Sequence, residues 1–520
     1  MAKYLMAIDA GTGSVRAVLF DLEGNQLGCS QQEWEHAENP RYPGSMDFDW
    51  VHNWDLARSC IQDVISETGI DPAEIGAVST TCMREGIVLY DKDGNEIWAC
   101  ANVDARANDE VAELIHSYPG LEKELYLESG QSYALDALPR LLWVKNKLPE
   151  IYEKIDRIGM FNDWLIYKLT GILAVEPSNG STTGLMDLKT RTWDPSILDR
   201  CGLKSSIFAP VKESGTVAGT VTANAALQTG LTEGTLVVVG GGDAQLGCIG
   251  VGAVDANDAA IFGGSFWQYE YNTDRADTDP QCRVRVNCHA VKNIWQYEAL
   301  AFTPGLVMRW FRDGFCQLEK QLAEKSGCDV YDLMNREAEK IPAGCYGMMC
   351  TFSDVMNFIN WKHAAPTFTN FQLDPVHFNR YTFYRAILEN TALVTKGHME
   401  LVQESTGHMP SEVIFASGAS KSPLWSQILA DVLGIPVKVP AVKEATALGA
   451  ALIAGYGTGI YPNISAAAKR LVKIDHTYLP NMENHKVYCE MYVQWKKLYA
   501  AQLALVNEGL TTPMWTAPGI

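Results

Sequence analysis

The sequence predicts an α/β protein with two large domains. Apolar runs of strand length alternate with helical patterns, which is typical of α/β folds, and glycine-rich turns follow several strands. The chain has 520 residues, more than one hydrophobic core usually holds. Both halves show strands followed by glycine turns, which fits a duplicated fold closing over a central cleft. We place the boundary in the small, polar stretch near 252–258, which gives domains 1–254 and 255–520.

In the first half, we expect a β-meander, a helix and further strands. The second apolar run ends at the turn signal DLEGNQ, and the helical pattern stops at Gly69. A later Asp-Gly-Asn turn between two strand-like runs predicts a hairpin. The expected elements are strands at 4–9, 15–21 and 75–80, a helix at about 50–68, and a hairpin within 86–106.

The second half repeats the pattern of strand and glycine turn. Residues 442–455 (VKEATALGAALIAG) predict a helix with small residues on its packing face. The other expected elements are a strand that runs into glycines at 235–247, a strand, turn and strand at 259–272, and a strand, glycine turn and helix at 411–434.

The composition argues against two kinds of partner. The formal net charge is −20, so neither nucleic acid nor an anionic membrane surface is expected to bind. No apolar run reaches 18 residues, and residues 4–10 fit a strand better than a signal sequence. We therefore expect a cytoplasmic protein.

The cysteine pattern agrees with that compartment. The thirteen cysteines are odd in number and form no CxxC pairs, which predicts buried free thiols in a reducing environment. The pairs Cys345/Cys350 and Cys288/His289 lack the further ligands of a metal site.

The turn AGTGS (10–14) has the chemistry of a phosphate site. It is neither a GK[ST] loop nor a GxGxxG motif followed by a helix. Its backbone N–H groups would form an anion nest, to which Thr12 and Ser14 add hydroxyl donors. Arg16 adds a bidentate cation suited to phosphate, and Asp9 would repel phosphate unless Mg²⁺ lies between them. The alternative is an ordinary exposed hairpin.

Two further turns of small residues resemble the first. One is Gly263–Gly264, and the other, at 417–420, is expected to lead directly into a helix whose N-terminus favours anions. Each signal alone also fits a plain turn. Together, the three turns suggest a nucleotide that contacts both halves of the chain.

Asp243 ends a strongly apolar strand within GGGDAQ. The glycines allow a substrate or the backbone to approach closely. A carboxylate there can accept the proton of a substrate hydroxyl, as a general base in phosphoryl transfer. The alternative is that Asp243 is a helix N-cap.

MREG (83–86) follows another strand and places Arg84 beside Glu85. In a cleft, adjacent donors and acceptors of this kind bind neighbouring hydroxyls of a small polyol. Asn102, Asp104 and Arg106 in ANVDAR follow the next hairpin and are expected to join that wall. The alternative is that Arg84 and Glu85 form a surface ion pair.

These motifs together resemble the FGGY family of carbohydrate kinases, which includes glycerol kinase and xylulokinase. They occur in family order over nearly the whole chain. The matching stretches are DAGTGSVR, MREG, VDAR, DWLIYKLTG, GGGDAQ, GGSF, SGASKSPLWSQILADV and EATALGAA.

The resemblance implies two ribonuclease-H-like, actin-related domains with ATP and Mg²⁺ in the cleft. It implies that Asp243 is the catalytic base, that Asp9 and Asp243 hold the metal, and that the second domain binds most of the nucleotide. The implied nucleotide contacts are Gly11, Thr12, Gly13, Ser14, Arg16, Gly263, Gly264, Ser265, Gly305, Gly418, Ala419 and Lys421. The implied substrate contacts are Arg84, Glu85, Asn102, Asp104, Asp243, Gln245, Phe266 and Trp267.

The chain departs from the family pattern mainly around the substrate. Asn102 replaces the usual tryptophan of the W-x-D-x-R stretch, and Leu135 replaces the substrate-wall tyrosine of glycerol kinase. Trp267 follows Phe266, and Gly263 replaces the threonine of the second phosphate turn, where Ser265 or backbone N–H groups are the candidate substitutes. These changes argue against glycerol as the substrate.

One branch of the family is more similar still, on stretches such as MREGIVLY, VVGGGDAQLGC, PAVKEATALG and the tail GLTT–W–APG. That branch phosphorylates the open-chain signal 4,5-dihydroxy-2,3-pentanedione at its terminal hydroxyl. The alternatives are a pentulose kinase and, outside the kinases, an actin-like ATPase module, against which the polar wall and Asp243 argue. Family precedents also imply a phosphotransferase-system protein such as HPr as a candidate regulator.

Overall fold

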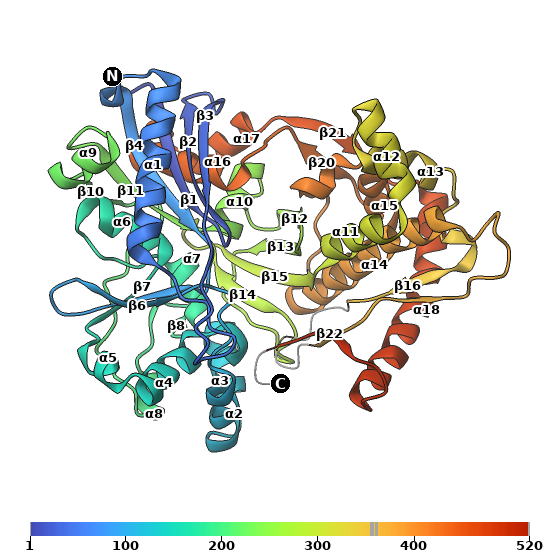
Figure 1. The fold of residues 1–520 in the computed structure, drawn as a ribbon, viewed down its shortest axis with the longest axis horizontal. Coiled ribbons are helices and arrows are strands. Elements are labelled where there is room, and N and C mark those ends of the chain that lie inside the picture. The colour runs from blue at the N-terminus through green and yellow to red at the C-terminus, as the bar shows by residue number, and fades with distance from the viewer. Residues whose placement is uncertain (1, 354–357, 359–361, 518–520) are drawn as a thin grey trace.

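The computed structural model describes residues 2–353, 358 and 362–517, apart from the side chains of residues 135 and 302. It contains two lobes side by side, each built on a mixed β-sheet (Figure 1). This confirms the predicted α/β architecture. Within the described ranges, none of the helices is long and apolar enough to cross a membrane.

The first lobe contains a six-stranded sheet in the order β10–β11–β4–β1–β2–β3. The first three strands in sequence form an antiparallel meander, and β4 and β11 continue the sheet in parallel with β1. The strands expected near 4–9, 15–21, 75–80 and 235–247 are all present. The bounds are β1 (Tyr4–Ala10), β2 (Ser14–Asp21), β3 (Gln26–Glu33), β4 (Ile75–Cys82), β10 (Val217–Thr220) and β11 (Leu236–Gly242).

The second lobe repeats this arrangement in a seven-stranded sheet, in the order β14–β15–β13–β12–β19–β20–β21. Its central strands β12, β13 and β15 are antiparallel, and β19 and β20 continue in parallel with β12. The bounds are β12 (Ala259–Gly263), β13 (Trp267–Thr273), β14 (Arg285–Cys288), β15 (Trp295–Phe302), β19 (Val413–Ala416), β20 (Val437–Pro440) and β21 (Ile474–Tyr478). The two sheets thus share the strand order that a duplicated fold requires.

Helices α1 (Trp50–Thr68) and α6 (Phe161–Thr170) cover one face of the first sheet. The predicted helix at 50–68 is confirmed: the Asp49 side chain caps its start, and Gly69 ends it with a φ of 65°. Trp54 and Ile61 of α1 pack with Ile8 and Leu19, whose side chains project from this face because side chains alternate along a strand.

The other face of the first sheet is covered by helices from two distant parts of the chain. They are α10 (Asp243–Val251), α16 (Ala445–Gly457) and α17 (Ile464–Leu471), which share a core with Leu5, Ala7 and Val18. Figure 1 shows α16 and α17, coloured orange-red, beside the blue strands. A Cβ on Gly449 would lie 1.8 Å from the Leu246 carbonyl oxygen, so α16 and α10 touch through a position that only glycine fits.

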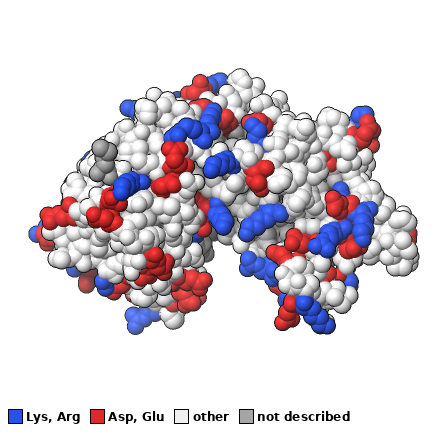
Figure 2. All heavy atoms as spheres, turned by 90° about the horizontal axis from the view of Figure 1, so that it is seen from above, with Lys and Arg blue, Asp and Glu red and all other residues white. Residues whose placement is uncertain are grey.

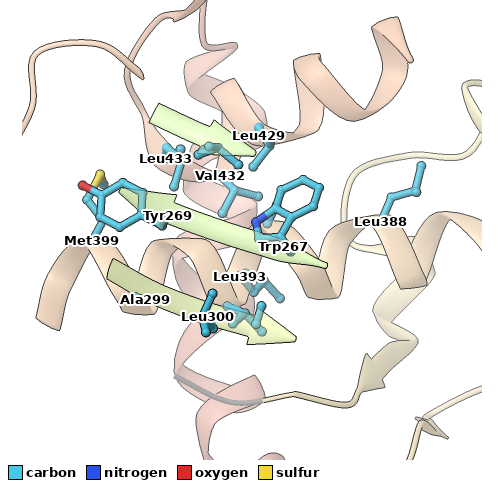
Figure 3. Close-up of a cluster of buried hydrophobic side chains, with 14 of the residues drawn as sticks. Trp267, Tyr269, Ala299, Leu300, Leu388, Leu393, Met399, Leu429, Val432 and Leu433 are labelled. Carbon is cyan, nitrogen blue, oxygen red and sulfur yellow. The ribbon is translucent and has the colours of Figure 1, made fainter. Parts of the chain in front are cut away.

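The second sheet is covered by α14 (Arg380–Thr406) and α15 (Pro423–Leu433), together with α18 (Met482–Asn507). Figure 3 shows Trp267 and Tyr269 of β13 packed among leucines of α14 and α15. These aromatic side chains are fully buried and form the centre of the second core.

A smaller subdomain extends the first lobe below its sheet (Figure 1). The predicted hairpin is present as β5 (Ile87–Tyr90) and β6 (Glu96–Cys100), and β7 (Arg157–Met160) completes its sheet. The helices that pack with this hairpin were not predicted from the sequence. They are α2 (Asn108–Ser117), α3 (Leu121–Ser129), α4 (Ala137–Lys147) and α5 (Pro149–Lys154).

Acidic and basic side chains are mixed over the face shown in Figure 2, so the net charge of −20 does not collect there in one patch. All thirteen cysteines are free thiols, and all but Cys29, Cys328 and Cys489 are buried.

Candidate active site

A cavity of about 680 Å³ is lined by residues of both lobes. The first lobe contributes Thr12, Arg84, Glu85, Asn102 and Asp243, which were all expected at the site from the sequence. The second lobe contributes residues of three strands, β13, β14 and β15, and of the loop before β13. They include Phe266, Gln268, Arg285 and Glu298, of which only Phe266 was predicted.

Asp243 is the first residue of α10 and directly follows β11. Its side chain is 41% exposed to the cavity, and Arg84 Nε donates a hydrogen bond to its Oδ1 at 3.1 Å. Desolvation raises the pKa of Asp243, although Arg84 acts in the opposite direction. The N-cap interpretation is wrong: the cap residue is Gly242, and the backbone N–H that donates to the Asp243 carboxylate is that of the next residue, Ala244, at 2.8 Å.

A buried chain of hydrogen bonds fixes the strand end that presents Asp243. The Gly242 N–H donates to Ser178 Oγ at 2.9 Å, and Ser178 Oγ donates to Glu176 Oε1 at 2.9 Å. Glu176 is fully buried, which raises its pKa to about 7. Neither residue was predicted, because both come from the helix Pro177–Gly180 and its cap rather than from a quoted motif.

Arg84 is held by the second lobe. Its guanidinium makes two contacts with Glu298, of which Nη2 to Oε1 is 3.0 Å. Both side chains are almost completely buried. Burial alone would lower the pKa of Arg84, but the neighbouring carboxylates raise it, so the guanidinium stays charged. The interpretation of Arg84 and Glu85 as a surface ion pair is therefore wrong.

Glu85 is paired across the lobes in the same way, with Arg285 Nη1 at 2.5 Å from its Oε1. Glu85 has a φ of 62°, a backbone conformation that costs energy for a residue other than glycine and that is often found at functional sites. Arg285 also lies 3.4 Å from Glu298. Two acids and two bases thus alternate across the boundary between the lobes.

Glu270 lies directly opposite Glu298 in the pairing of β13 with β15. Neither of its carboxyl oxygens has a hydrogen-bond partner among the described residues. Burial raises the pKa of Glu270 far above its usual range, whereas Arg84 and Arg285 outweigh burial and lower that of Glu298. These opposite shifts favour the negative charge on Glu298 over Glu270.

Asn102 lines the cavity, but Asp104 does not. Asn102 Nδ2 donates to Thr12 Oγ1 at 3.0 Å, which joins the first turn to the substrate wall. The side chain of Asp104 is fully buried, where it pairs with Arg106 and accepts from the Met46 N–H at 2.6 Å. Asp104 and Arg106, expected at the substrate wall, thus do not line the cavity, and the pair braces the loop that carries Asn102.

Two other predicted substrate contacts lie in the protein interior. Trp267 is fully buried, donates to Thr395 Oγ1 at 3.0 Å and stacks on Trp425, so it belongs to the core (Figure 3). Gln245 is also fully buried and donates to Gln296 Oε1 at 2.9 Å. Neither lines the cavity. The side chain of Leu135 lies outside the described residues.

The first turn, with Gly11, Gly13 and Ser14, connects β1 to β2. Trp34 Nε1 donates to the Gly11 carbonyl at 3.0 Å, and His36 Nε2 lies 2.6 Å from the Thr12 carbonyl. These contacts occupy the carbonyl groups of the turn.

Arg16 lies between two carboxylates, with Glu444 Oε2 at 2.5 Å and Asp9 Oδ2 at 3.4 Å. The pKa of Asp9 is raised to about 6, mainly by burial and in smaller part by the nearby Asp243, while Arg16 acts in the opposite direction. Glu444 was missed as a site residue, although it is the acid of the quoted motif EATALGAA and precedes α16.

The turns of the second lobe meet each other. A Cβ on Gly263 would lie 2.8 Å from that of Ala419, and a Cβ on Gly305 would lie 1.9 Å from the Gly264 carbonyl oxygen. Gly305 is in the first turn of α11 (Pro304–Phe315), so this helix begins against the turn that holds Ser265. Gly418–Lys421 form a short 3-10 helix before α15, so the expectation that this turn leads directly into an α-helix is wrong.

Comparison with known proteins gives a consistent result. Residues 4–250 match the N-terminal domain, and residues 276–458 the C-terminal domain, of the FGGY family of carbohydrate kinases. Among curated relatives, an autoinducer-2 kinase of Enterobacter sp. (strain 638) is 51% identical, with 99% of this chain and 98% of that protein aligned. An autoinducer-2 kinase of Yersinia enterocolitica is 50% identical, with 99% and 98% aligned.

Solved structures agree in fold. A xylulose kinase from Rhodospirillum rubrum aligns with a TM-score of 0.85 and 25% identity, over 97% of this chain and 100% of that chain. A Plasmodium falciparum glycerol kinase with ADP aligns with a TM-score of 0.83 and 20% identity, over 96% and 98%.

Proposed function

The chain belongs to the FGGY family of carbohydrate kinases, and we propose that it uses ATP to phosphorylate the terminal hydroxyl of open-chain 4,5-dihydroxy-2,3-pentanedione, the autoinducer-2 signal. The curated relatives named autoinducer-2 kinase support this substrate, since they are about half identical over nearly the full length of both chains. Family membership also decides against a non-kinase ATPase module.

The observation that carries the chemistry is the Asp243 carboxylate, which is exposed in the cavity and hydrogen-bonded to Arg84. In the proposed reaction, Asp243 accepts the proton of the substrate hydroxyl as the hydroxyl oxygen attacks the γ-phosphorus of ATP. The bond from that phosphorus to the bridging oxygen breaks, and ADP leaves. Arg84 stabilises the ionised form of Asp243 before the proton is transferred.

The nucleotide is proposed to bind along the turns of both lobes. Gly305 and Ala419 bring the start of α11 and the Gly418–Lys421 turn against Gly263–Ser265, and the N-terminus of α11 favours anions. In the first lobe, Arg16 would exchange one of its carboxylate partners for phosphate.

Asp9 and Asp243 are proposed to hold Mg²⁺, which would neutralise charge on the phosphates. The two carboxylates lie close enough for Asp243 to raise the pKa of Asp9. No group of three or more potential His, Cys, Asp or Glu ligands occurs in the described part of the chain. This fits Mg²⁺, which usually takes only one or two carboxylates and completes its shell with phosphate and water.

Regulation by HPr stays a prediction.

The proposed substrate is tested by measuring ADP release with dihydroxypentanedione, xylulose, ribulose and glycerol. We expect the highest kcat/KM for dihydroxypentanedione. A higher kcat/KM for xylulose or ribulose would instead identify a pentulose kinase. Mass spectrometry of the product would locate the phosphate on the terminal carbon.

A further inference from the structure

The last described strand of the chain forms part of the cavity wall. β22 (Pro513–Thr516) and the residue after it contribute Trp515, Thr516 and Ala517 to the cavity lining. The strand pairs antiparallel with β17 (Lys362–Ala364), with Trp515 opposite His363. Figure 1 shows β22 near the middle of the view, between the two lobes.

The strand is anchored on both sides. β17 is tied to α18, because the Ala364 N–H donates to the Tyr499 hydroxyl at 3.0 Å. Met514 of β22 has its Sδ 3.6 Å from Thr303 Oγ1, and Ala517, the residue after the strand, is 2% exposed within the second core. β22 is therefore a wall of defined position and not a loose tail.

Trp515 lies beside an uncharged aromatic ring, that of His363. Its ring centroid lies 6.0 Å from that of His363, and the rings are tilted by 38°. Burial lowers the pKa of His363 to about 4, so the imidazole is neutral at physiological pH. Phe266 and Leu300 add further apolar surface to the same cavity, in contrast to its charged wall of Arg84 and Asp243.

The proposed substrate has matching chemistry. One end carries the two hydroxyl groups, and the other is a methyl ketone joined to a second carbonyl. Glycerol and the pentuloses instead carry a hydroxyl at each end. A flat, methyl-bearing dicarbonyl gains from contact with an apolar aromatic face, whereas a hydroxyl placed there would lose hydrogen bonds to water.

We propose that Trp515 of β22 determines substrate specificity by packing against the methyl-ketone end of the substrate while the terminal hydroxyl reaches Asp243. This inference rests on the proposed function, because it takes its substrate from there. In this arrangement β22 distinguishes the dicarbonyl from polyols, and residues of the two lobes carry out phosphate transfer.

The test compares Trp515→Ala and Trp515→Phe with Met514→Ala as the matched control. Met514 lies on the same strand but does not line the cavity, so its truncation reports on loosening of β22 alone. In Trp515→Ala we expect KM for dihydroxypentanedione to rise about 10-fold or more, as for other losses of apolar substrate contacts. Trp515→Phe should recover part of the affinity, and KM for ATP should stay unchanged in both. Met514→Ala should leave both KM values unchanged.

The outcomes separate this inference from the proposed function. If the wild-type enzyme releases no ADP with dihydroxypentanedione, both are wrong. If the wild type is active and Trp515→Ala keeps its KM, only the role of Trp515 is wrong. Equal increases in KM for Trp515→Ala and Met514→Ala would also overturn the role of Trp515. The position of β22 would then determine KM, and not contact between the indole and the substrate. Should Trp515→Ala not fold, the same comparison applies to Trp515→Phe and Trp515→Leu.

Discussion

At the scale of single residues, hydrogen bonds of the β11 backbone fix the position of Asp243, and Arg84 stabilises the negative charge of its carboxylate. The hydrogen bonds from Gly242 to Ser178 and from Ser178 to Glu176 fix the end of β11, and Arg84 Nε lies 3.1 Å from the Asp243 carboxylate. Arg84 is in turn fixed by Glu298 of the second lobe. A base that must take a proton in a defined direction benefits from such restraint.

The first prediction concerns proton acceptance by Asp243. Asp243→Asn keeps the size of the side chain but cannot accept the proton, so turnover should fall by a factor on the order of 10² to 10⁴. Substrate KM should change little. Steady-state ADP release measures both constants, and near-normal turnover of the asparagine variant would exclude the role of base.

The second prediction uses the raised pKa of Glu176. The unfolded chain ionises this group near 4.5, but the folded protein holds the proton up to about pH 7. Folding therefore loses stability as pH rises through this window, by at most about 3 kcal/mol at about 1.4 kcal/mol per pKa unit. Glu176→Gln removes the titration, so its Tm should rise relative to wild type between pH 5 and pH 8.

Differential scanning calorimetry across that pH range measures the difference. Glu508→Gln, on the exposed end of α18, is the control and should follow the wild type at every pH. A constant difference in Tm between Glu176→Gln and wild type would show that Glu176 has an ordinary pKa.

Residues of the site could be predicted from the sequence where the signal is local. Asp243, Arg84 and Thr12 follow strands in small-residue turns, and the structure brings all three to one cavity. Arg285 and Glu298 have no such signal, because they are ordinary strand residues whose partners are distant in sequence. Trp267 was wrongly predicted to contact substrate for the opposite reason: it follows a recognised turn, but strand alternation points its side chain into the core.

At the scale of elements, the predictions succeeded for strands bounded by turn residues and for α1 and α16. The short helices between 108 and 154 were not predicted, and in one of them, α4, most side chains are buried all round. A helix without an exposed polar face shows no 3.6-residue pattern to detect.

The third prediction concerns the start of α11. Gly305→Ala would place a methyl group 1.9 Å from the Gly264 carbonyl oxygen, so the helix must move away from the phosphate turn. We expect a higher KM for ATP. Gly314→Ala is the matched control in the same helix, because nothing lies within 4 Å of its Cβ position. An unchanged KM for ATP in a folded Gly305→Ala variant would separate α11 from nucleotide binding.

At the scale of the whole molecule, the site is shared between two lobes. Arg84 and Glu85 of the first lobe pair with Glu298 and Arg285 of the second, and the proposed phosphate turns are likewise divided. Transfer requires the hydroxyl, the γ-phosphate and the base to be in near contact and shielded from water.

The fourth prediction follows from that division. Substrate together with a non-hydrolysable ATP analogue should draw the lobes closer, with a hinge near residues 250–260. Small-angle scattering can follow this change without labels. Labels attached to thiols would be harder to place, because the chain has thirteen native free cysteines. The radius of gyration should decrease when both ligands are present. An unchanged radius in an active enzyme would mean that the site is assembled before ligands bind.

Helices α16 and α17 come late in the sequence but pack on the first lobe, and this has a consequence for biosynthesis. These helices cover an apolar face of the first sheet, yet they follow β11 by some two hundred residues. At 5–20 residues per second, the ribosome needs roughly 10 to 40 seconds to supply them. During that interval the nascent first lobe exposes Leu5, Ala7 and Val18 to solvent. The newly made chain therefore passes through an aggregation-prone stage, during which chaperones would find a binding surface that the finished enzyme no longer has.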